Sequence, residues 1–343
     1  MNMKVLITGG AGFIAHHVID HILKTTDWHI TTLDRLDESG NLNRLNDILK
    51  EHTPENRKRH RTVFHDLKAA LNSQIRADIG DIDIVLHLAA GSHVDRSITH
   101  PMEFVQDNVV GTVNLLNWAK ELPNLKKFVY FSTDEIFGVA PPGVSYKEYD
   151  RYNSTNPYSA SKAAAEEFCV AYENTYKMPI YITHTMNVFG QRQHPEKFIP
   201  GTIQRVRDGH KVTIHADSSK TKAGSRMYIH ASDVAEGLMF ILNLDNYVHK
   251  GDFGWAKCPK FNLVGTEEVD NLKLAQMISD AVGKHLNYEM VDFHTSRPGH
   301  DLRYALSGDL LKKLGWEPRI KLSERIKETV DWTLANDRWL RNS

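Results

Sequence analysis

Two adjacent carboxylates, Asp134 and Glu135, follow a strongly apolar run in the stretch KKFVYFSTDEIFG, residues 126–138. Such a pair can be a solvated turn at the end of a buried strand. It can also be an acid–base pair, because neighbouring carboxyl groups whose pKa values are pushed apart can take up one proton and donate another. The choice depends on which other reactive residues the chain provides.

A tyrosine and a lysine four residues apart, Tyr158 and Lys162, lie in the stretch NPYSASKAAAEEF, residues 156–168. On a helix this spacing puts both side chains on one face. A free tyrosine has a pKa of about 10 and is a poor base at neutral pH, but a lysine ammonium and a positively charged nicotinamide nearby favour the phenolate. Lowering the pKa by about three units takes roughly 4 kcal/mol. The pair alone is common by chance, and it gains meaning if the chain also binds a nicotinamide cofactor.

A glycine-rich turn in KVLITGGAGFIAHHVIDHIL, residues 4–23, is the candidate cofactor site. Glycines at Gly9 and Gly12 allow a tight turn and let the backbone approach a pyrophosphate at the start of a helix, where Phe13 and Ile14 follow. Asp34 comes 22 residues after Gly12, about where an acid binds the adenosine ribose 2′-hydroxyl and repels a 2′-phosphate. The alternative is a purely structural glycine turn. We expect these five residues to bind NAD rather than NADP.

The first half of the chain, which must position these residues, alternates short β-branched runs with helical patterns. Several runs are apolar without alternation, as in parallel strands covered on both faces. This order predicts an α/β fold with a doubly wound, parallel Rossmann-type sheet. The expected strands are 4–8, 29–33, 62–66, 83–89, 127–132 and 179–186, and the expected helices include 13–24, 104–122 and 158–176.

The pattern changes near residue 190, where prolines, helices of mixed polarity and short strands such as 211–215 and 260–264 replace the regular alternation. We therefore predict two domains. Residues 1–189 form an NAD-binding Rossmann domain that also carries the tyrosine and lysine. Residues 190–343 form mostly a smaller, mixed α/β lobe that binds the substrate.

The composition limits the possible partners. The 343 residues include 42 basic and 43 acidic side chains, a net charge of −1, so we expect no nucleic-acid or membrane partner. Cys169 and Cys258 are too few for a disulfide framework and suit a reducing cytosol. We find no metal-ligand spacing and no apolar stretch long enough for a signal sequence or a membrane span. We expect a cytoplasmic protein without a metal site.

The spacing Gly9-x-x-Gly12-x-x-Ala15 resembles the extended branch of the short-chain dehydrogenase/reductase superfamily, and the resemblance covers residues 3 to about 306. It implies that further segments contact the cofactor or lead into a sugar pocket. The segment HDL contributes Asp66 and Leu67 beside the adenine. The segment LHLAAGSHVDRS, residues 86–97, contributes Ala89 at the cofactor and Ser92 and His93 toward the sugar.

Within this superfamily, the motif TDE resembles nucleotide-sugar 4,6-dehydratases, most closely the dTDP-glucose 4,6-dehydratase group. The resemblance implies that Thr133 hydrogen-bonds the reacting substrate oxygen beside Tyr158 and Lys162. It also implies that Glu135 takes the C5 proton and Asp134 protonates the leaving 6-hydroxyl. An elimination across C5 and C6 needs such an acid and base together.

Other segments resemble the parts of these enzymes that hold the nucleotide diphosphate. The implied substrate-binding residues are Asn187, Glu196, Lys197, Arg226, Asn262, Arg297 and His300. The chain departs from the pattern at two places. Gly91 stands where the dTDP-glucose enzymes have a glutamate, and the stretch 214–229 is longer and more polar than their usual turn.

These features together predict a nucleotide-sugar 4,6-dehydratase of deoxysugar biosynthesis that converts dTDP- or UDP-glucose to the 4-keto-6-deoxy sugar nucleotide and water. The C4 hydride would be stored on bound NAD and returned to C6. The resemblance also implies a homodimer, formed through the helices that hold VVGTVNLL and Tyr158. The alternatives are a dehydratase or 4-epimerase acting on an N-acetylated or other nucleotide sugar and, more distantly, a non-catalytic NAD-binding protein.

Overall fold

The computed structural model describes residues 2–244, 247–250, 256–293 and 302–341, which divide into two compact units. The first unit comprises residues 1–136, 156–184 and 238–261, and the second comprises residues 137–155, 185–237 and 262–343. The sequence analysis expected a single boundary near residue 189. The chain instead passes repeatedly between the units, so each unit is assembled from segments that are distant in sequence.

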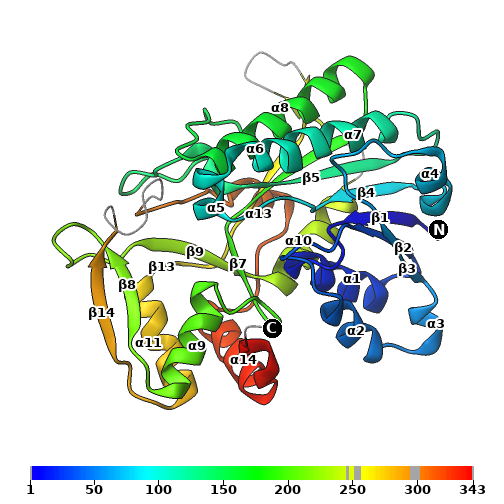
Figure 1. Ribbon diagram of the computed structural model, residues 1–343. Helices are drawn as coiled ribbons and strands as arrows, with labels where there is room; N and C mark the ends of the chain where they lie inside the picture. The colour runs from blue at the N-terminus through cyan, green and yellow to red at the C-terminus, as the bar shows by residue number, and fades with distance from the viewer. Residues whose placement is uncertain (1, 245–246, 251–255, 294–301, 342–343) are drawn as a thin grey trace. The chain divides into compact units, whose positions relative to one another are not determined.

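A seven-stranded sheet forms the centre of the first unit (Figure 1). Its strand order is β12-β6-β5-β4-β1-β2-β3, and β1 pairs in parallel with both β2 and β4. In a sheet of this type the order reverses beside the first strand, and ligands bind at the carboxyl ends of the strands there. The strands are β1 (Lys4–Thr8), β2 (His29–Asp34), β3 (His60–Phe64), β4 (Ile84–His87), β5 (Lys127–Thr133), β6 (Ile180–Thr185) and β12 (Lys260–Leu263).

The strand β12 corrects part of the sequence analysis, which expected residues 260–264 to lie in the substrate lobe. Lys260 and Phe261 belong to the first unit, whereas residues 262–264 belong to the second. The structure places this strand beside β6 at the edge of the main sheet. Its four residues are all buried, which is compatible with a place at the covered edge of the main sheet. A short apolar run does not itself show which sheet it will join, because strand pairing is decided by distant segments.

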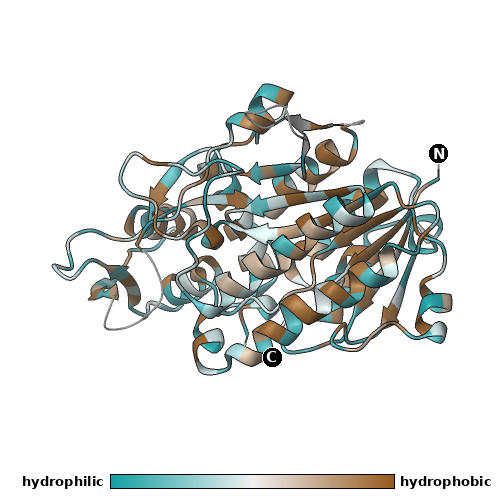
Figure 2. Cartoon of the chain, turned by 90° about the horizontal axis from the view of Figure 1, so that it is seen from above, coloured by the Kyte–Doolittle hydropathy of each residue, from teal (hydrophilic) through white to brown (hydrophobic). Residues whose placement is uncertain are grey.

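Helices cover both faces of the main sheet, with α6, α7 and α8 on one side and α1 and α2 on the other (Figure 1). The strands are rich in hydrophobic residues, whereas the helices mix hydrophobic and hydrophilic residues (Figure 2). Leu6, Val85 and Phe128 have no exposed surface, as expected for strands covered on both faces. The helices are α1 (Phe13–Thr25), α2 (Leu42–Lys50), α3 (Pro54–Arg57), α4 (Ser73–Ile79), α5 (Val94–Thr99), α6 (Pro101–Phe104), α7 (Gly111–Ala119) and α8 (Pro157–Tyr176), and β10 (His249–Lys250) pairs with β11 (Ala256–Lys257).

The helix expected over residues 104–122 is interrupted. A π-helical turn, η1 (Val105–Val110), separates α6 from α7. Within it Asn108 is buried, and its side-chain amide bonds both the N–H and the carbonyl of Gly91, at 2.8 and 3.0 Å. Segments of π-helix are rare and frequently lie at functional sites.

The second unit contains two small sheets. One has the order β13-β9-β7, the other pairs β14 with β8, and α9, α11 and α14 pack around them. In the described residues, the helices of both units lack the length or the apolar character needed to cross a membrane. The elements are β7 (Asn187–Phe189), β8 (Val212–Ala216), β9 (Ser225–His230), β13 (Glu268–Asp270), β14 (Tyr288–Asp292), α9 (Phe198–Asp208), α11 (Asn271–Val282), α13 (Asp309–Leu314), α14 (Leu322–Ala335) and η3 (Asp337–Leu340), with α10 (Ala231–Leu242) beginning here and ending in the first unit.

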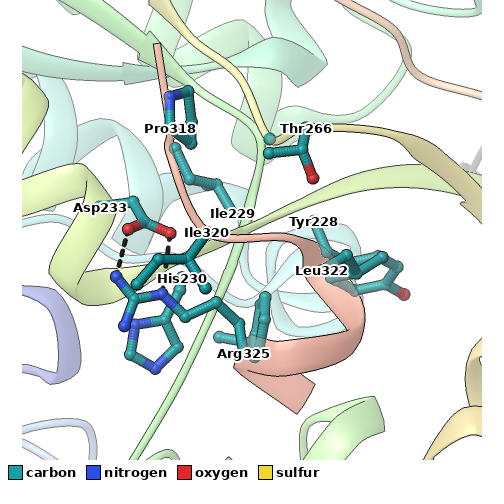
Figure 3. A pocket seen from close by; sticks show the side chains of 11 residues that line it. Tyr228, Ile229, His230, Asp233, Thr266, Pro318, Ile320, Leu322 and Arg325 are labelled. Carbon is teal, nitrogen blue, oxygen red and sulfur yellow. Dashed lines mark hydrogen bonds and ion pairs between the residues drawn. The ribbon is translucent and has the colours of Figure 1, made fainter. Parts of the chain in front are cut away.

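A small cavity in the second unit is lined by residues of β9, α10 and α14 (Figure 3). The guanidinium of Arg325 beside it donates two hydrogen bonds to the carboxylate of Asp233 and one to Glu328. Arg325 and Asp233 are both buried. A bidentate pair of this kind joins α14 to α10, which makes it a structural element of this unit.

Candidate active site

The two adjacent carboxylates lie at the carboxyl end of β5. The strand ends at Thr133, and a single 3₁₀ turn, η2 (Asp134–Phe137), begins at once. Thr133 and Asp134 are 7% and 5% exposed, and the Thr133 hydroxyl donates to Asp134 Oδ1 at 3.1 Å. The backbone N–H of Glu135 donates to the same hydroxyl at 3.3 Å. This segment is a buried, ordered turn, which disfavours the solvated-turn alternative.

The first turn of α8 brings Tyr158 to this place. Asn156 caps the helix by accepting a hydrogen bond from Ser159 N at 2.8 Å, and the reciprocal bond from Asn156 N to Ser159 Oγ completes a capping box. The Tyr158 N–H donates to Ser97 Oγ on α5 at 3.1 Å, and its phenol lies close enough to Thr133, Glu135 and Asp134 for each of them to influence its pKa. The structure therefore brings Tyr158 to the consecutive residues Thr133, Asp134 and Glu135, although Tyr158 follows Glu135 by 23 positions in sequence.

The electrostatic surroundings of Tyr158 differ from the expectation. Burial, and then the charges of Glu135 and Asp134, raise its pKa well above the ordinary value of about 10, while the nearby Thr133 hydroxyl acts in the opposite direction. Lys162 does not offset these effects. Its ammonium donates to the Phe131 carbonyl at 2.6 Å, and burial lowers the pKa of Lys162 to about 8.

Sequence reasoning did not identify Asn156 as part of the site. Its side-chain N–H donates to Glu135 Oε2 at 3.1 Å, while its side-chain oxygen caps α8. One residue thus links the helix that carries Tyr158 to the second carboxylate. The capping signal was visible in NPYS, because asparagine before proline with serine three residues on is typical of a helix start. The bond to Glu135 was not visible.

Another group missed from sequence lies one helical turn after Lys162. Glu166 is fully buried and accepts hydrogen bonds from Lys260 Nζ at 2.8 Å and His184 Nε2 at 3.0 Å. These contacts hold the pKa of Glu166 well below its ordinary value despite its burial. The cluster ties α8 to β6 and β12. In the part of the chain that the structure describes, no group of three His, Cys, Asp or Glu side chains is arranged to hold a metal ion.

The glycine turn after β1 fits the close approach of a cofactor backbone. Gly9 has φ +70°, and a Cβ added there would lie 2.9 Å from the Cα of Ala89. A Cβ at Gly12, which caps α1, would lie 2.8 Å from the Gly9 carbonyl. Asp34 at the end of β2 is buried and accepts hydrogen bonds from Ala11 N and Leu36 N, at 2.9 and 2.7 Å. Larger side chains at either glycine would close the turn.

A cavity opens at this turn, beside the switch point between β1 and β4. Five of the predicted cofactor residues line it: Gly9, Asp34, Asp66, Leu67 and Ala89. Three others, Gly12, Phe13 and Ile14, lie at the start of α1, where backbone N–H groups favour a pyrophosphate. The cavity is also lined by residues that the sequence analysis did not select: Leu33, Arg35, Asp37, His65, Lys68, Ala90, Gly91 and Asp107.

The predicted sugar-side residues of the first unit lie on the loop between β4 and α5. Ser92 is exposed. His93 caps α5 by accepting from Arg96 N at 3.3 Å.

The predicted substrate residues of the second unit are spread over several elements. Asn187 and Glu196 are exposed, and Lys197 lies 3.4 Å from the Glu196 carboxylate. Arg226 on β9 donates to the Leu302 carbonyl at 2.7 Å and lies over the Tyr304 ring.

Asn262 has a structural use that the sequence analysis did not foresee. It is 1% exposed, and its amide donates to the carbonyls of Tyr146 and Ser307 at 3.1 and 3.0 Å. These bonds join three segments of the second unit. Arg297 and His300 lie outside the described residues.

Comparisons with known proteins agree with this geometry. Residues 6–329 match the family model described as GDP-mannose 4,6 dehydratase. The chain is 35% identical over 341 residues to dTDP-D-glucose 4,6-dehydratase of Mus musculus, covering 97% of this chain and 89% of the mouse protein. It is 36% identical over 340 residues to the trifunctional UDP-glucose 4,6-dehydratase/UDP-4-keto-6-deoxy-D-glucose 3,5-epimerase/UDP-4-keto-L-rhamnose-reductase of Arabidopsis thaliana, covering 98% of this chain and 48% of that protein.

A solved structure shows the same arrangement of elements. The dTDP-glucose 4,6-dehydratase of Streptomyces venezuelae, crystallised with NAD and TYD bound, superposes with a TM-score of 0.83 at 31% identity, covering 98% of both chains. The match extends over both units of the chain. This chain therefore belongs to the GDP-mannose 4,6-dehydratase family, a nucleotide-sugar group within the extended short-chain dehydrogenases/reductases.

Proposed function

We propose that the protein is an NAD-dependent nucleotide-diphosphate-hexose 4,6-dehydratase that acts on dTDP-glucose or UDP-glucose. The observation that carries the proposal is the buried turn at the end of β5, where Asp134 and Glu135 follow Thr133 directly and lie close to the Tyr158 phenol. A simple oxidation or epimerisation at C4 needs the hydroxyl and the phenol. Removing water across C5 and C6 also needs an acid and a base at the same sugar, and this turn supplies two carboxyl groups.

The surroundings of the two carboxyl groups support different roles. Glu135 accepts a charge-assisted hydrogen bond from Asn156, which stabilises the ionised form that a base requires. Asp134 is buried next to Glu135 and is the other carboxyl group available at this turn, so the acid role falls to Asp134. We therefore assign removal of the C5 proton to Glu135 and protonation of the leaving 6-hydroxyl to Asp134.

The remaining catalytic residues act at C4. Tyr158 takes the proton of the 4-hydroxyl, and Thr133 holds the same oxygen through its hydroxyl. Bound NAD would supply the hydride acceptor for C4, the hydride returned to C6, and a positive charge beside the phenol. Because the chain's own carboxylates raise the pKa of Tyr158, the positive charge of bound NAD is needed to favour the phenolate. Lys162, one helical turn after Tyr158, is the candidate for holding the nicotinamide ribose.

Substrate contacts and assembly are part of the same proposal. Arg226 and Lys197, with Arg297 and His300 from the sequence resemblance, are the candidates for the diphosphate because arginine and lysine suit phosphate oxygens. A homodimer is supported by apolar side chains that remain exposed on η1 and α8, which pack against each other. These exposed residues are Val105, Val110 and Phe168.

A panel of dTDP-, UDP-, CDP- and GDP-sugars tests the reaction. We expect loss of water and a 4-keto-6-deoxy product, seen as an 18-dalton mass decrease and as absorbance that develops in alkali. A 4-epimerase would return an isomer of unchanged mass, and a non-catalytic protein would return the substrate itself. Either of these results with every sugar would contradict the proposal.

A further inference from the structure

Two neighbouring residues at the end of β2 favour different cofactors, one NAD and the other NADP. Asp34 is the type of residue that binds a ribose 2′-hydroxyl and repels a 2′-phosphate, whereas an arginine nearby is the type that accepts a 2′-phosphate. Arg35 follows Asp34 directly and lines the same cavity. The prediction of NAD from sequence rested on Asp34 and did not consider Arg35.

The structure shows that the guanidinium of Arg35 is already engaged. Its Nη1 and Nη2 donate to the two carboxylate oxygens of Asp107 at 2.5 and 2.8 Å. Its Nε and Nη2 donate to Asp37 Oδ2 at 3.0 and 2.7 Å. Nη1 also lies 3.6 Å from the carboxylate of Asp66. These four hydrogen bonds use most of the five N–H donors that an arginine has.

The charge around the cavity also disfavours the 2′-phosphate of NADP. Its described lining contains four carboxylates, those of Asp34, Asp37, Asp66 and Asp107, against the cations Arg35 and Lys68. Lys68 is itself within 3.6 Å of both Asp66 and Asp107. A dianionic 2′-phosphate would therefore enter a region of net negative charge.

Asp107 reaches Arg35 because Gly91 leaves room for it. A Cβ added at Gly91 would lie 3.3 Å from Asp107 Oδ2 and 3.3 Å from the ring of Phe104. The amide of Asn108, the next residue of η1, binds the Gly91 backbone on both sides. A glutamate at position 91, as in the resembling enzymes, would place a like charge against Asp107. This relates the departure at Gly91 to the adenosine end of the cofactor.

We propose that Asp107, together with Asp37, holds Arg35 as a closed ion-pair cluster and that this cluster makes the site reject NADP. Asp107 is thus a specificity-determining residue although it lies 73 positions after Asp34. The inference rests on the NAD site of the proposed function and is independent of the sugar substrate. Failure of the sugar assay would therefore leave it intact, and its own failure would leave the dehydratase proposal intact.

The test compares bound nucleotide in four proteins. The wild type, D37N/D107N, D37N/D107N/R35L and R35L are each equilibrated with equal concentrations of NAD and NADP, and the nucleotide released by heat is quantified by chromatography. Freeing Arg35 to bind a phosphate should raise the bound NADP-to-NAD ratio of D37N/D107N at least about tenfold, the effect of one charge-assisted hydrogen bond. Adding R35L should abolish that gain. R35L alone should leave the wild-type ratio within about twofold, because the engaged guanidinium contributes nothing to NADP.

A matched control removes two carboxylates elsewhere. D331N/D337N breaks exposed ion pairs with Lys327 and Arg341, so it changes net charge equally and should leave the ratio unchanged. An unchanged ratio in folded D37N/D107N would overturn the proposal, as would a gain that persists after R35L. If the double variant does not fold, D107N alone is used, and a ratio that rises less than about twofold would have the same meaning.

Discussion

Replacing Glu135 by glutamine should separate the oxidation of the sugar from the elimination of water. Glutamine keeps the length of the side chain and one oxygen that can accept the hydrogen bond from Asn156, which is 3.1 Å from Glu135 Oε2. Changing that bond from charge-assisted to neutral should cost only about 1 kcal/mol of folding stability. The variant should therefore fold, but it has no carboxylate to take the C5 proton.

The expected magnitude follows from the two roles of the Glu135 charge. Loss of a general base should reduce dehydration turnover by about 10²–10⁴-fold, or roughly 3–5 kcal/mol of barrier. The same charge is, after burial, the largest cause of the raised pKa of Tyr158. Removing it should lower that pKa, so the oxidation at C4 should reach its maximal rate at a lower pH, by on the order of one unit.

Quenched reactions analysed by mass spectrometry and NMR measure both effects. We expect a 4-keto-hexose nucleotide that still carries its 6-hydroxyl, and a pH profile for its formation shifted toward acid. In the wild type run in heavy water, deuterium should enter at C5, because Glu135 exchanges its proton with solvent before returning it. Normal dehydration by E135Q, or a wild-type product without C5 deuterium, would refute the assignment.

Three other substitutions and measurements follow from the site. Asn156→Ala should lower dehydration turnover by about tenfold, because Glu135 loses a charge-assisted hydrogen bond. The control Asn72→Ala removes the cap of α4 and should cost the same ~1 kcal/mol of folding stability as Asn156→Ala, with unchanged turnover. Equal turnover in the two variants would contradict the role of Asn156. Glu166→Gln should cost about 3–5 kcal/mol in denaturant unfolding, because Lys260 keeps a buried charge without its counterion. Folding lowers the pKa of Glu166. The contribution of Glu166 to folding stability is therefore fully present above its unfolded pKa of about 4.3 and is lost as the pH falls toward the folded value. The wild type should thus lose stability below about pH 4 faster than the variant. Heat-denatured wild type should release NAD and no NADP, and release of NADP would contradict the role of Asp34.

The main sheet was predictable because its strands carry the signal of their burial. Residues 4–8 and 127–132 are apolar without alternation, and both are strands covered on two faces. The pairing of the edge strand β12 with the main sheet was not predicted, because a run of four buried residues is compatible with either sheet. The single boundary near residue 189 failed for a related reason. Contacts between distant segments define a compact unit, and local composition does not report them.

The candidate site divides in the same way. Gly9 and Asp34 follow the spacing rule of one strand–helix–strand unit, Tyr158 and Lys162 follow the spacing of one helix, and sequence reasoning selected all four. The upward shift of the pKa of Tyr158 was not foreseen, because it depends on carboxylates that a different element brings close. The sequence shows Lys162 four residues after Tyr158, but it does not show that the ammonium of Lys162 hydrogen-bonds the Phe131 carbonyl.

The sequence by itself determined the class of fold, the glycine turn with its acid, and the reactive residue types, because each of these depends on local spacing and on the burial of individual strands. Only the tertiary structure decided which partners those residues have. Asn156 reaches Glu135 across 21 positions, and Asp107 reaches Arg35 across 72. Hydrogen bonds and ion pairs act over about 3 Å in space whatever the separation along the chain, so they exist only once the sheet and its helices have brought the segments together.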